Sequence, residues 1–310
     1  MPLRHRLAPR VVAVLGALVT FSVVGMLTAT AATGGDFSYV GHRGYPEARY
    51  TENTIASFQN AYTHGAPAVE TDVRLTKDKQ FLLMHDQTLG RTTSCRHVHV
   101  ADRRLHWILD HCRGRRHHEP IPDLTELLRW GHERAMNLLV EIKTDPRDRW
   151  RTSDFARIDT LVKRFHMSGR VHLLSFSAPL LQLAERADPS FVSDWIVTSQ
   201  AVGNWAKIEA QASWADSVSV QAGALTTERV ADLHALGLEV YGRDTDLTSD
   251  WTRLREIGAD GLLTDRVAAY RTWLRTAPPP TEPTDPGDPT DPGDPTDPGD
   301  PTDPEPPAGS

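Results

Sequence analysis

The feature that most constrains the fold is a regular alternation of short β-rich runs and amphipathic helical segments between about residues 33 and 277. Eight such runs separated by helices over the length of one large domain indicate an α/β protein with a TIM (β/α)8 barrel. Asn53 and Asp123 are the expected N-caps of two of the helices. The predicted strands are residues 37–41, 67–73, 137–142, 171–176, 194–197, 216–220, 238–242 and 261–264, and the helices include 54–62, 124–132, 226–236 and 252–257.

Residues 81–86 (FLLMHD) form a further strand-like run that breaks this alternation. They follow residues 67–73 so closely that no crossover helix fits between the two runs. We therefore predict a β-hairpin that extends the second strand. His85 would then lie over the same end of the barrel as the residues of that strand.

The first 32 residues have the pattern of a secretory signal peptide. Three arginines within residues 1–10 precede an uncharged apolar run over 11–27, and small residues around Ala29 and Ala31 form a cleavage site of the A-x-A type. The alternative is an uncleaved membrane anchor, because the run is close to the length that spans a bilayer. Both interpretations predict an exported, extracellular protein, and we expect it in or near the cell wall or a membrane surface.

Residues 278–310 repeat Asp, Pro, Gly and Thr and contain no large apolar side chain, so we predict a disordered acidic tail after a folded domain at 33–277. We interpret the tail as a spacer, with weak calcium binding by its aspartates as the alternative. It carries nine acidic residues, so its removal changes the formal net charge from −7 to −7 + 9 = +2, and removing the three N-terminal arginines leaves −1. A nearly neutral folded part argues against nucleic-acid binding. We expect the protein to be a monomer.

The chain has two cysteines, Cys95 and Cys112. In an exported protein an even pair predicts a disulfide, here stapling a surface loop. Six of the fourteen histidines lie between these cysteines or just after them, so a zinc site of cysteine and histidine is the alternative.

Charged residues interrupt two of the predicted strands. Glu70 and Asp72 are two positions apart, as are Glu141 and Lys143, so each pair shares one face of its strand while apolar neighbours take the other. Charges directed inward near the carboxyl ends of barrel strands are typical of an active site. Three buried carboxylates exceed what Lys143 neutralises, which favours a divalent cation, and hard oxygen ligands favour Ca²⁺ or Mg²⁺. The alternative is a purely structural set of buried ion pairs.

A series of short motifs resembles the glycerophosphodiester phosphodiesterase family: GHRG, ENT, VETDV, TKD, MHD, RTT, IPDLTELL, EIK and GADGLLTD, in this order between about residues 38 and 270. The resemblance implies a metal-dependent TIM-barrel phosphodiesterase that acts on a small-molecule glycerophosphodiester substrate and releases sn-glycerol 3-phosphate and an alcohol. Positions that match the family's motifs are then metal ligands (Glu70, Asp72 and Glu141), a general acid–base pair (His42 and His85) and phosphate-contacting cations (Arg43 and Lys143).

Some positions depart from the family's pattern or have an open role. Arg243 and Asp244 stand near where relatives carry an aromatic residue and an asparagine, so they are expected to reshape the mouth of the pocket. Glu52 either approaches the site or is a carboxylate at a helix start, and we favour the helix start. Trp107 either covers the substrate or anchors the loop that contains it. Two other activities fit parts of the pattern, a phospholipase D of the sphingomyelinase type and a non-catalytic cell-surface binding protein.

Overall fold

The computed structural model describes residues 38–47, 49–243 and 245–277, so the predicted signal peptide and acidic tail lie outside the described residues. Its strands form a closed parallel barrel with the order β1-β9-β8-β7-β6-β5-β4-β2, and β1 pairs with β2 to close it. This confirms the predicted TIM barrel. The barrel strands are β1 (Ser38–Gly41), β2 (Ala68–Leu75), β4 (Asn137–Ile142), β5 (Val171–Ser175), β6 (Val192–Ile196), β7 (Ser217–Gln221), β8 (Glu239–Arg243) and β9 (Gly261–Thr264).

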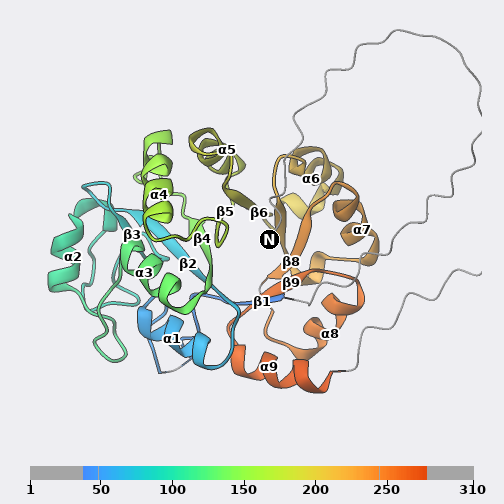
Figure 1. The fold of residues 1–310 in the computed structure, drawn as a ribbon, viewed down its shortest axis with the longest axis horizontal. Coiled ribbons are helices and arrows are strands. Elements are labelled where there is room, and N and C mark those ends of the chain that lie inside the picture. Colours follow the sequence, from blue (N-terminus) through green and yellow to red (C-terminus); the bar gives the residue numbers. More distant parts are fainter. Residues whose placement is uncertain (1–37, 48, 244, 278–310) are drawn as a thin grey trace, which may run out of the picture. The chain divides into compact units, whose positions relative to one another are not determined.

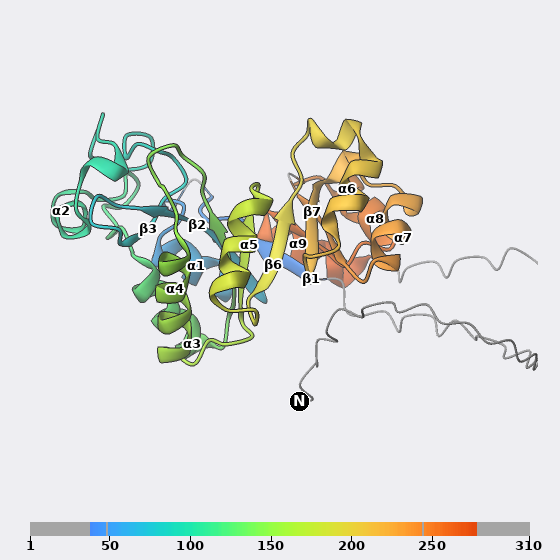
Figure 2. The same ribbon diagram turned by 90° about the horizontal axis from the view of Figure 1, so that it is seen from above.

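Helices follow the strands and lie around the outside of the barrel (Figures 1 and 2). Except in the insertion between β3 and α3, their apolar faces pack on the outward side chains of the strands and build the main core. Among the described residues, none of the helices has the length and hydrophobicity of a transmembrane span. The helices are α1 (Ile55–Thr63), α2 (Leu105–His111), α3 (Leu124–Arg134), α4 (Thr152–Arg164), α5 (Ala178–Ala187), α6 (Trp205–Ala212), α7 (Thr227–Ala235), α8 (Thr248–Glu256) and α9 (Val267–Thr276).

The predicted cap of the first helix is wrong by one residue. Thr54, not Asn53, has the extended backbone of an N-cap, and its hydroxyl accepts a hydrogen bond from the amide of Ser57. Asn53 has a positive φ of 57° and directs its amide toward β2 instead. The predicted cap of α3 is confirmed, because the Asp123 side chain accepts from the amide of Glu126 at 2.8 Å.

The hairpin after the second strand is also confirmed, although it is shorter than predicted. Strand β3 (Phe81–Leu83) pairs antiparallel with the end of β2, with Leu83 opposite Val73 and Phe81 opposite Leu75. His85 therefore lies two residues after β3, at the end of β2 where the active-site side chains were expected.

The barrel interior has an apolar layer beneath its open end. Side chains from six strands form it, with Tyr241 of β8 packed against them. Residues two positions apart in a strand point to the same side, so the side chains that follow this layer along each strand also point into the barrel. The apolar layer therefore forms the floor of the cavity, below the polar residues at the strand ends. Its members are Val40, Ala68, Leu139, Leu174, Ile196 and Leu263.

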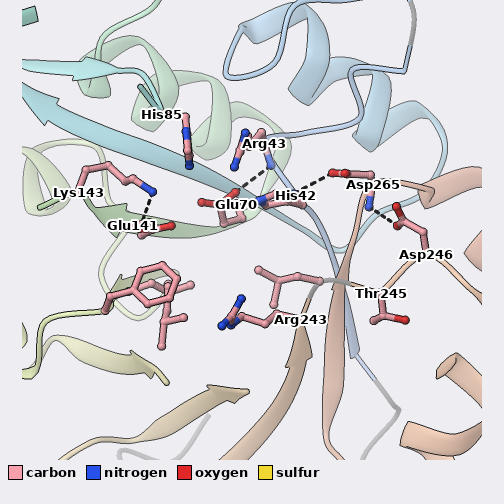
Figure 3. Close-up of a pocket in the computed structure, with 14 residues that line it drawn as sticks. His42, Arg43, Glu70, His85, Glu141, Lys143, Arg243, Thr245, Asp246 and Asp265 are labelled. Atoms are coloured by element: carbon pink, nitrogen blue, oxygen red, sulfur yellow. Dashed lines mark hydrogen bonds and ion pairs between the residues drawn. The ribbon is translucent and has the colours of Figure 1, made fainter. Parts of the chain in front are cut away.

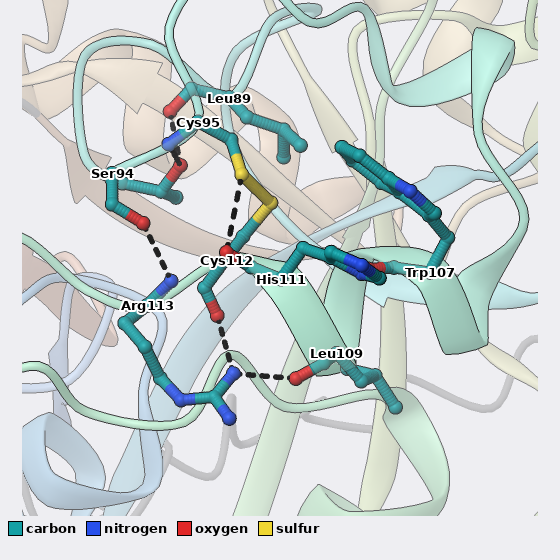
Figure 4. The surroundings of a disulfide bond; sticks show 9 residues. Leu89, Ser94, Cys95, Trp107, Leu109, His111, Cys112 and Arg113 are labelled. Atoms are coloured by element: carbon teal, nitrogen blue, oxygen red, sulfur yellow. Dashed lines mark hydrogen bonds between the residues drawn. A yellow bond between two sulfur atoms is a disulfide. The ribbon is translucent and has the colours of Figure 1, made fainter.

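The segment between β3 and α3 is an insertion with its own small apolar core, which contains Leu89, Ile108 and Cys112. Cys95 and Cys112 are bonded, which confirms the predicted disulfide and removes both cysteines from any zinc site (Figure 4). Trp107 stacks on His111 with ring centroids 4.8 Å apart and packs against this core. It is not among the residues that line the central pocket, so it anchors the insertion.

Candidate active site

The carboxyl ends of the barrel strands surround a cavity of about 250 Å³ that contains charged side chains from three neighbouring strands (Figure 3). His42 and Arg43 follow β1, Glu70 lies in β2, and Glu141 lies in β4. His85 and Lys143, which follow β3 and β4, complete this part of the wall, while Asp72 of β2 is fully buried beneath it. The structure therefore brings together all seven residues that the sequence assigned to catalysis, phosphate binding and metal binding.

The turn after β1 positions His42 and Arg43 through two glycines that no larger residue could replace. A Cβ on Gly41 would lie 2.6 Å from the carbonyl oxygen of Gly44. Gly44 has a φ of +85°, and a Cβ there would lie 2.3 Å from the hydroxyl of Ser57. Within this tight turn the amide of Arg43 donates a hydrogen bond to Glu70 at 2.9 Å, so the turn is bound directly to the second strand.

Three carboxylates form the centre of the site. Glu70, Asp72 and Glu141 are 1%, 0% and 8% exposed, and one oxygen from each lies within 4.8 Å of the others. Asp72 and Glu141 are direct partners in the pairing of β2 with β4. The Oε1 atom of Glu70 is buried without a hydrogen-bond partner in the described part of the chain. A buried carboxylate oxygen of this kind, beside two other oxygen ligands, fits a divalent cation.

Two cations partly neutralise this cluster. The Lys143 ammonium lies 2.8 Å from Glu141 and 3.2 Å from Asp72, and the Nε atom of Arg43 lies 3.3 Å from Asp72. Burial raises the pKa of Glu70, and the charge of Asp72 raises it further. Burial acts on Asp72 in the same direction, but Lys143 and Arg43 outweigh it and hold its pKa below the ordinary value. Two cations do not offset three ionised carboxylates, so Glu70 favours its protonated form unless a further cation binds.

The Asp72 carboxylate is held in place by Asn53. The amide nitrogen of Asn53 donates to Asp72 at 2.7 Å, while its oxygen accepts from the Thr71 hydroxyl at 2.7 Å and the Asp72 amide at 3.2 Å. Asn53 follows Glu52 in the ENT motif, so that motif fixes a carboxylate of the cluster from the neighbouring loop.

His42 is paired with a carboxylate from the far end of the chain. Its Nδ1 atom lies 2.8 Å from Asp265, which follows β9. Burial disfavours the charged imidazole, but the hydrogen bond to Asp265 and the charge of Glu70 outweigh burial and raise the pKa of His42 to about 9. The imidazolium form is therefore the stable one at neutral pH.

His85 has a similar partner in a different charge environment. Its Nδ1 atom lies 2.7 Å from Asp86, and Arg91 binds the same carboxylate through Nε at 2.6 Å. Burial lowers the pKa of His85, and although Asp72 and Asp86 oppose this effect, the pKa stays below its ordinary value. The neutral imidazole is therefore the stable form at neutral pH.

Glu52 connects this pair to Arg43. It accepts from Arg91 at 2.6 and 2.8 Å and from Arg43 at 3.0 Å. The interpretation of Glu52 as a helix-start carboxylate is therefore wrong, because the two guanidinium groups hold it. A continuous network of ion pairs thus connects two residues that line the pocket. It runs from Arg43 through Glu52, Arg91 and Asp86 to His85.

The remaining wall of the pocket belongs to the other strands and is half apolar and half polar. Its apolar residues are Leu174 and Phe176 from the end of β5, Ile196 of β6 and Leu263 of β9, and its polar residues are Arg243 of β8, Thr245, Asp246 and Asp265. Arg243 is thus a pocket residue, as its departure from the family pattern suggested, while Asp244 lies outside the described residues.

Asp265, Asp86 and Arg91 were not identified from the sequence as site residues. Each lies inside a motif used for the resemblance, GADGLLTD, MHD or RTT, which is the signal that could have found them. Periodicity could not, because each follows a strand in a loop, where the direction of a side chain is not fixed by alternation.

Over residues 42–269 the chain matches the Glycerophosphoryl diester phosphodiesterase family. The Bacillus subtilis protein YqiK is 28% identical over 72% of this chain and 93% of its own length. A glycerophosphodiester phosphodiesterase from Caldanaerobacter subterraneus subsp. tengcongensis is 26% identical over 73% of this chain and 93% of its own. The solved structure of an Oleispira antarctica phosphodiesterase, in complex with the product sn-glycerol-3-phosphate, has a TM-score of 0.66 at 22% identity and covers 77% of this chain and 96% of that one. The chain belongs to the glycerophosphoryl diester phosphodiesterase family.

Proposed function

We propose that the protein hydrolyses glycerophosphodiesters to sn-glycerol 3-phosphate and an alcohol. The observation that carries this proposal is the buried cluster of Glu70, Asp72 and Glu141 within 4.8 Å of one another, in the same pocket as two histidines and two cations. Family membership supports the reaction class, and the product bound to the Oleispira antarctica relative supports the substrate class.

Glu70, Asp72 and Glu141 would hold a divalent metal, Ca²⁺ or Mg²⁺, because carboxylate oxygens suit hard cations. When bound, such an ion stabilises the negative charge that a phosphodiester gains in its transition state. Arg43 and Lys143 contribute fixed positive charge at the edge of the same cluster. Both are preorganised by their carboxylate partners, so little rearrangement is needed when substrate binds.

In this proposal His85 is the general base and His42 the general acid. Neutral His85 removes a proton from the attacking oxygen, which belongs to water or to the glycerol 2-hydroxyl. The attacking oxygen forms a bond to phosphorus as the bond to the leaving oxygen breaks, and the imidazolium of His42 gives its proton to that oxygen. When the attacking group is the 2-hydroxyl, a water molecule then opens the cyclic phosphate.

The test is an assay of glycerol 3-phosphate release from glycerophosphocholine and glycerophosphoglycerol, with EDTA and after Ca²⁺ or Mg²⁺ is restored. We expect turnover that EDTA abolishes and one of the two ions restores. Glu141→Gln should lose the activity, while Asp194→Asn should keep it, because Asp194 is a buried carboxylate of the same barrel that lies outside the pocket. Turnover of lysolipid or sphingomyelin without turnover of either glycerophosphodiester would favour a phospholipase D instead. Absence of turnover on every substrate would favour a binding protein.

We also propose that the protein is exported. The N-terminal 32 residues and the disulfide support this proposal, since structural disulfides persist in oxidising compartments. N-terminal sequencing of the protein from culture medium should find a start near residue 32 or 33, and recovery of the uncleaved chain from the cytoplasm alone would contradict export.

A further inference from the structure

A second pocket lies between the loop that follows β1 and the insertion that follows β3. Its volume is about 430 Å³, and it shares no lining residue with the central pocket. Three arginines of the insertion line it, Arg91, Arg115 and Arg116, together with the carboxylates Glu47 and Glu52 of the loop. We call this cavity the basic pocket. The proposed hydrolysis gives it no role.

The basic pocket adjoins the active site. Arg43, which lines the central pocket, and Arg91, which lines the basic pocket, donate to the same oxygen of Glu52 at 3.0 and 2.6 Å. Asp86 makes a second connection, because it accepts from Arg91 at 2.6 Å and lies 2.7 Å from Nδ1 of His85. Single carboxylate side chains therefore join the two pockets, and a group bound in one lies near the other.

The segment that carries Arg115 and Arg116 is held in a fixed position. It follows the disulfide that staples the insertion (Figure 4). The amide of Gly114 donates to the carbonyl of Glu119 at 2.8 Å, and the amide of Arg115 donates to the carbonyl of Thr92 at 2.9 Å. A Cβ on Gly114 would lie 2.4 Å from a carboxylate oxygen of Glu119, so the segment packs tightly at this point.

Glu119 also binds this segment to the loop on the other side of the pocket. It is 7% exposed, and its two carboxylate oxygens accept from the amide and the hydroxyl of Thr51, both at 2.8 Å. The Thr51 hydroxyl oxygen accepts from the amide of Arg116 at 3.2 Å. The two walls are thus hydrogen-bonded to each other, so the pocket is formed before any ligand binds.

The two carboxylates that line the basic pocket already have partners. Glu52 is bonded to both Arg43 and Arg91. Glu47 accepts a hydrogen bond from the hydroxyl of Tyr45. Neither carboxylate is within ion-pair distance of the other arginines of the pocket.

Arg115 and Arg116 therefore add positive charge that the lining carboxylates do not offset. Nη1 of Arg115 donates to the carbonyl of Arg91 at 3.4 Å, and no ion pair among the described residues engages Arg115 or Arg116. Ala48, the residue of the neighbouring loop outside the described ranges, has no charged group. Three guanidinium groups at separate positions suit a phosphate, whose oxygens accept hydrogen bonds from several directions, better than a carboxylate.

We propose that the basic pocket binds a phosphate group through Arg91, Arg115 and Arg116. This group is either a second phosphate of a substrate whose scissile phosphodiester occupies the central pocket, or free phosphate. Phosphate binding itself does not depend on the proposed hydrolysis, whereas a role as a substrate subsite rests on it.

Titration calorimetry with inorganic phosphate tests the site without turnover. The full chain is treated with EDTA, so that no divalent cation holds phosphate in the central pocket. Arg115→Gln/Arg116→Gln should weaken phosphate binding about tenfold or more, because hydrogen bonds to charged groups are strong. The matched control is Arg96→Gln/Arg104→Gln, which removes the same charge from exposed positions of the insertion outside the pocket and should keep the affinity.

Equal phosphate binding by the wild type and Arg115→Gln/Arg116→Gln would overturn the site, and so would an equal loss in the control. Absence of phosphate binding by the wild type would also overturn it, including the case in which acidic residues after position 277 occupy the pocket.

Kinetics distinguish the two sources of phosphate. The substrates are glycerophosphoglycerol, which has one phosphate, and bis(glycerophospho)glycerol, which has two. If the second phosphate of a substrate binds here, Arg115→Gln/Arg116→Gln should raise KM about tenfold for the second substrate and by less than about threefold for the first. Unchanged KM values together with lost phosphate binding would assign the pocket to free phosphate. Failure of the wild type to hydrolyse either substrate would overturn the proposed hydrolysis, while calorimetry would still decide the phosphate site.

Discussion

The two histidines of the site each have an aspartate as their hydrogen-bond partner, but their pKa values are shifted in opposite directions. Nδ1 of His42 lies 2.8 Å from Asp265, and Nδ1 of His85 lies 2.7 Å from Asp86. Yet the pKa of His42 is raised and the pKa of His85 is lowered. A hydrogen bond to a carboxylate therefore does not by itself determine the protonation state of an imidazole.

The difference comes from the charges around each pair. Burial lowers the pKa of both rings, but at His42 the hydrogen bond to Asp265 and the nearby charge of Glu70 exceed that effect. At His85 the carboxylate of Asp86 is shared with Arg91, and the cations Lys143 and Arg43 oppose protonation. One fold thereby supplies an acid and a base from the same residue type, which a phosphodiester hydrolysis at neutral pH requires.

Replacing either histidine should produce the largest effect. His42→Asn and His85→Asn should each reduce kcat/KM by about 10²–10⁴ on a diester of an aliphatic alcohol, because each removes one proton transfer. His234→Asn is the matched control, since His234 lies 2.8 Å from Asp260 in a similar pair outside the pocket. Wild-type rates in either site variant would remove that histidine from the mechanism.

Removing the partner of His42 should change the pH profile more than the maximal rate. The acid must be protonated, so kcat/KM should fall as the pH rises through the pKa of His42. Asp265→Asn removes the main favourable interaction of the imidazolium, so this alkaline limb should move down by about 1–2 pH units, with a loss of about two- to tenfold at pH 8. Asp86→Asn should instead move the acidic limb to lower pH, because Asp86 raises the pKa of His85. An unchanged alkaline limb in Asp265→Asn would contradict the assignment of the acid.

Breaking the ion pair between Asp86 and Arg91 should shift the pH dependence of kcat/KM by less than removing either aspartate. In Arg91→Gln the Asp86 carboxylate would act on His85 without a competing cation, so the pKa of His85 should rise. The acidic limb of kcat/KM should move up by at most about one pH unit while the alkaline limb stays in place. Arg147→Gln, which breaks an exposed ion pair with Asp102, is the control. A shift of the alkaline limb alone would mean that Arg91 acts on His42 rather than His85.

The sequence predicted the barrel well because its signals are local and repeated. Alternating apolar runs and helical segments located every barrel strand to within a few residues, and the parity of Glu70 with Asp72 and of Glu141 with Lys143 predicted their shared faces. The first helix cap was missed because Asn and Thr are both good N-caps, and the choice depended on a contact of Asn53 with Asp72 on another element.

The charge network could not be predicted in the same way. Glu52, Arg91 and Asp265 have partners on other loops, and His42 meets Asp265 across 223 positions of the chain. Asp86 has its partners, His85 and Arg91, within the segment after β3. Their directions depend on how the loops fold over the barrel end, which no sequence period encodes. Arg243 was suggested only by its departure from the family's pattern, and the structure was needed to place it in the pocket.

The assignment of His42 as acid and His85 as base is tested most directly with a leaving group that needs no protonation. On sn-glycero-3-phospho-p-nitrophenol, His42→Asn should regain most of the rate it loses on the glycerol diester, because p-nitrophenolate departs without a proton, whereas His85→Asn should stay about 10²–10⁴ below wild type. Rescue of His85→Asn instead of His42→Asn would reverse the assignment, and rescue of neither or of both would contradict it.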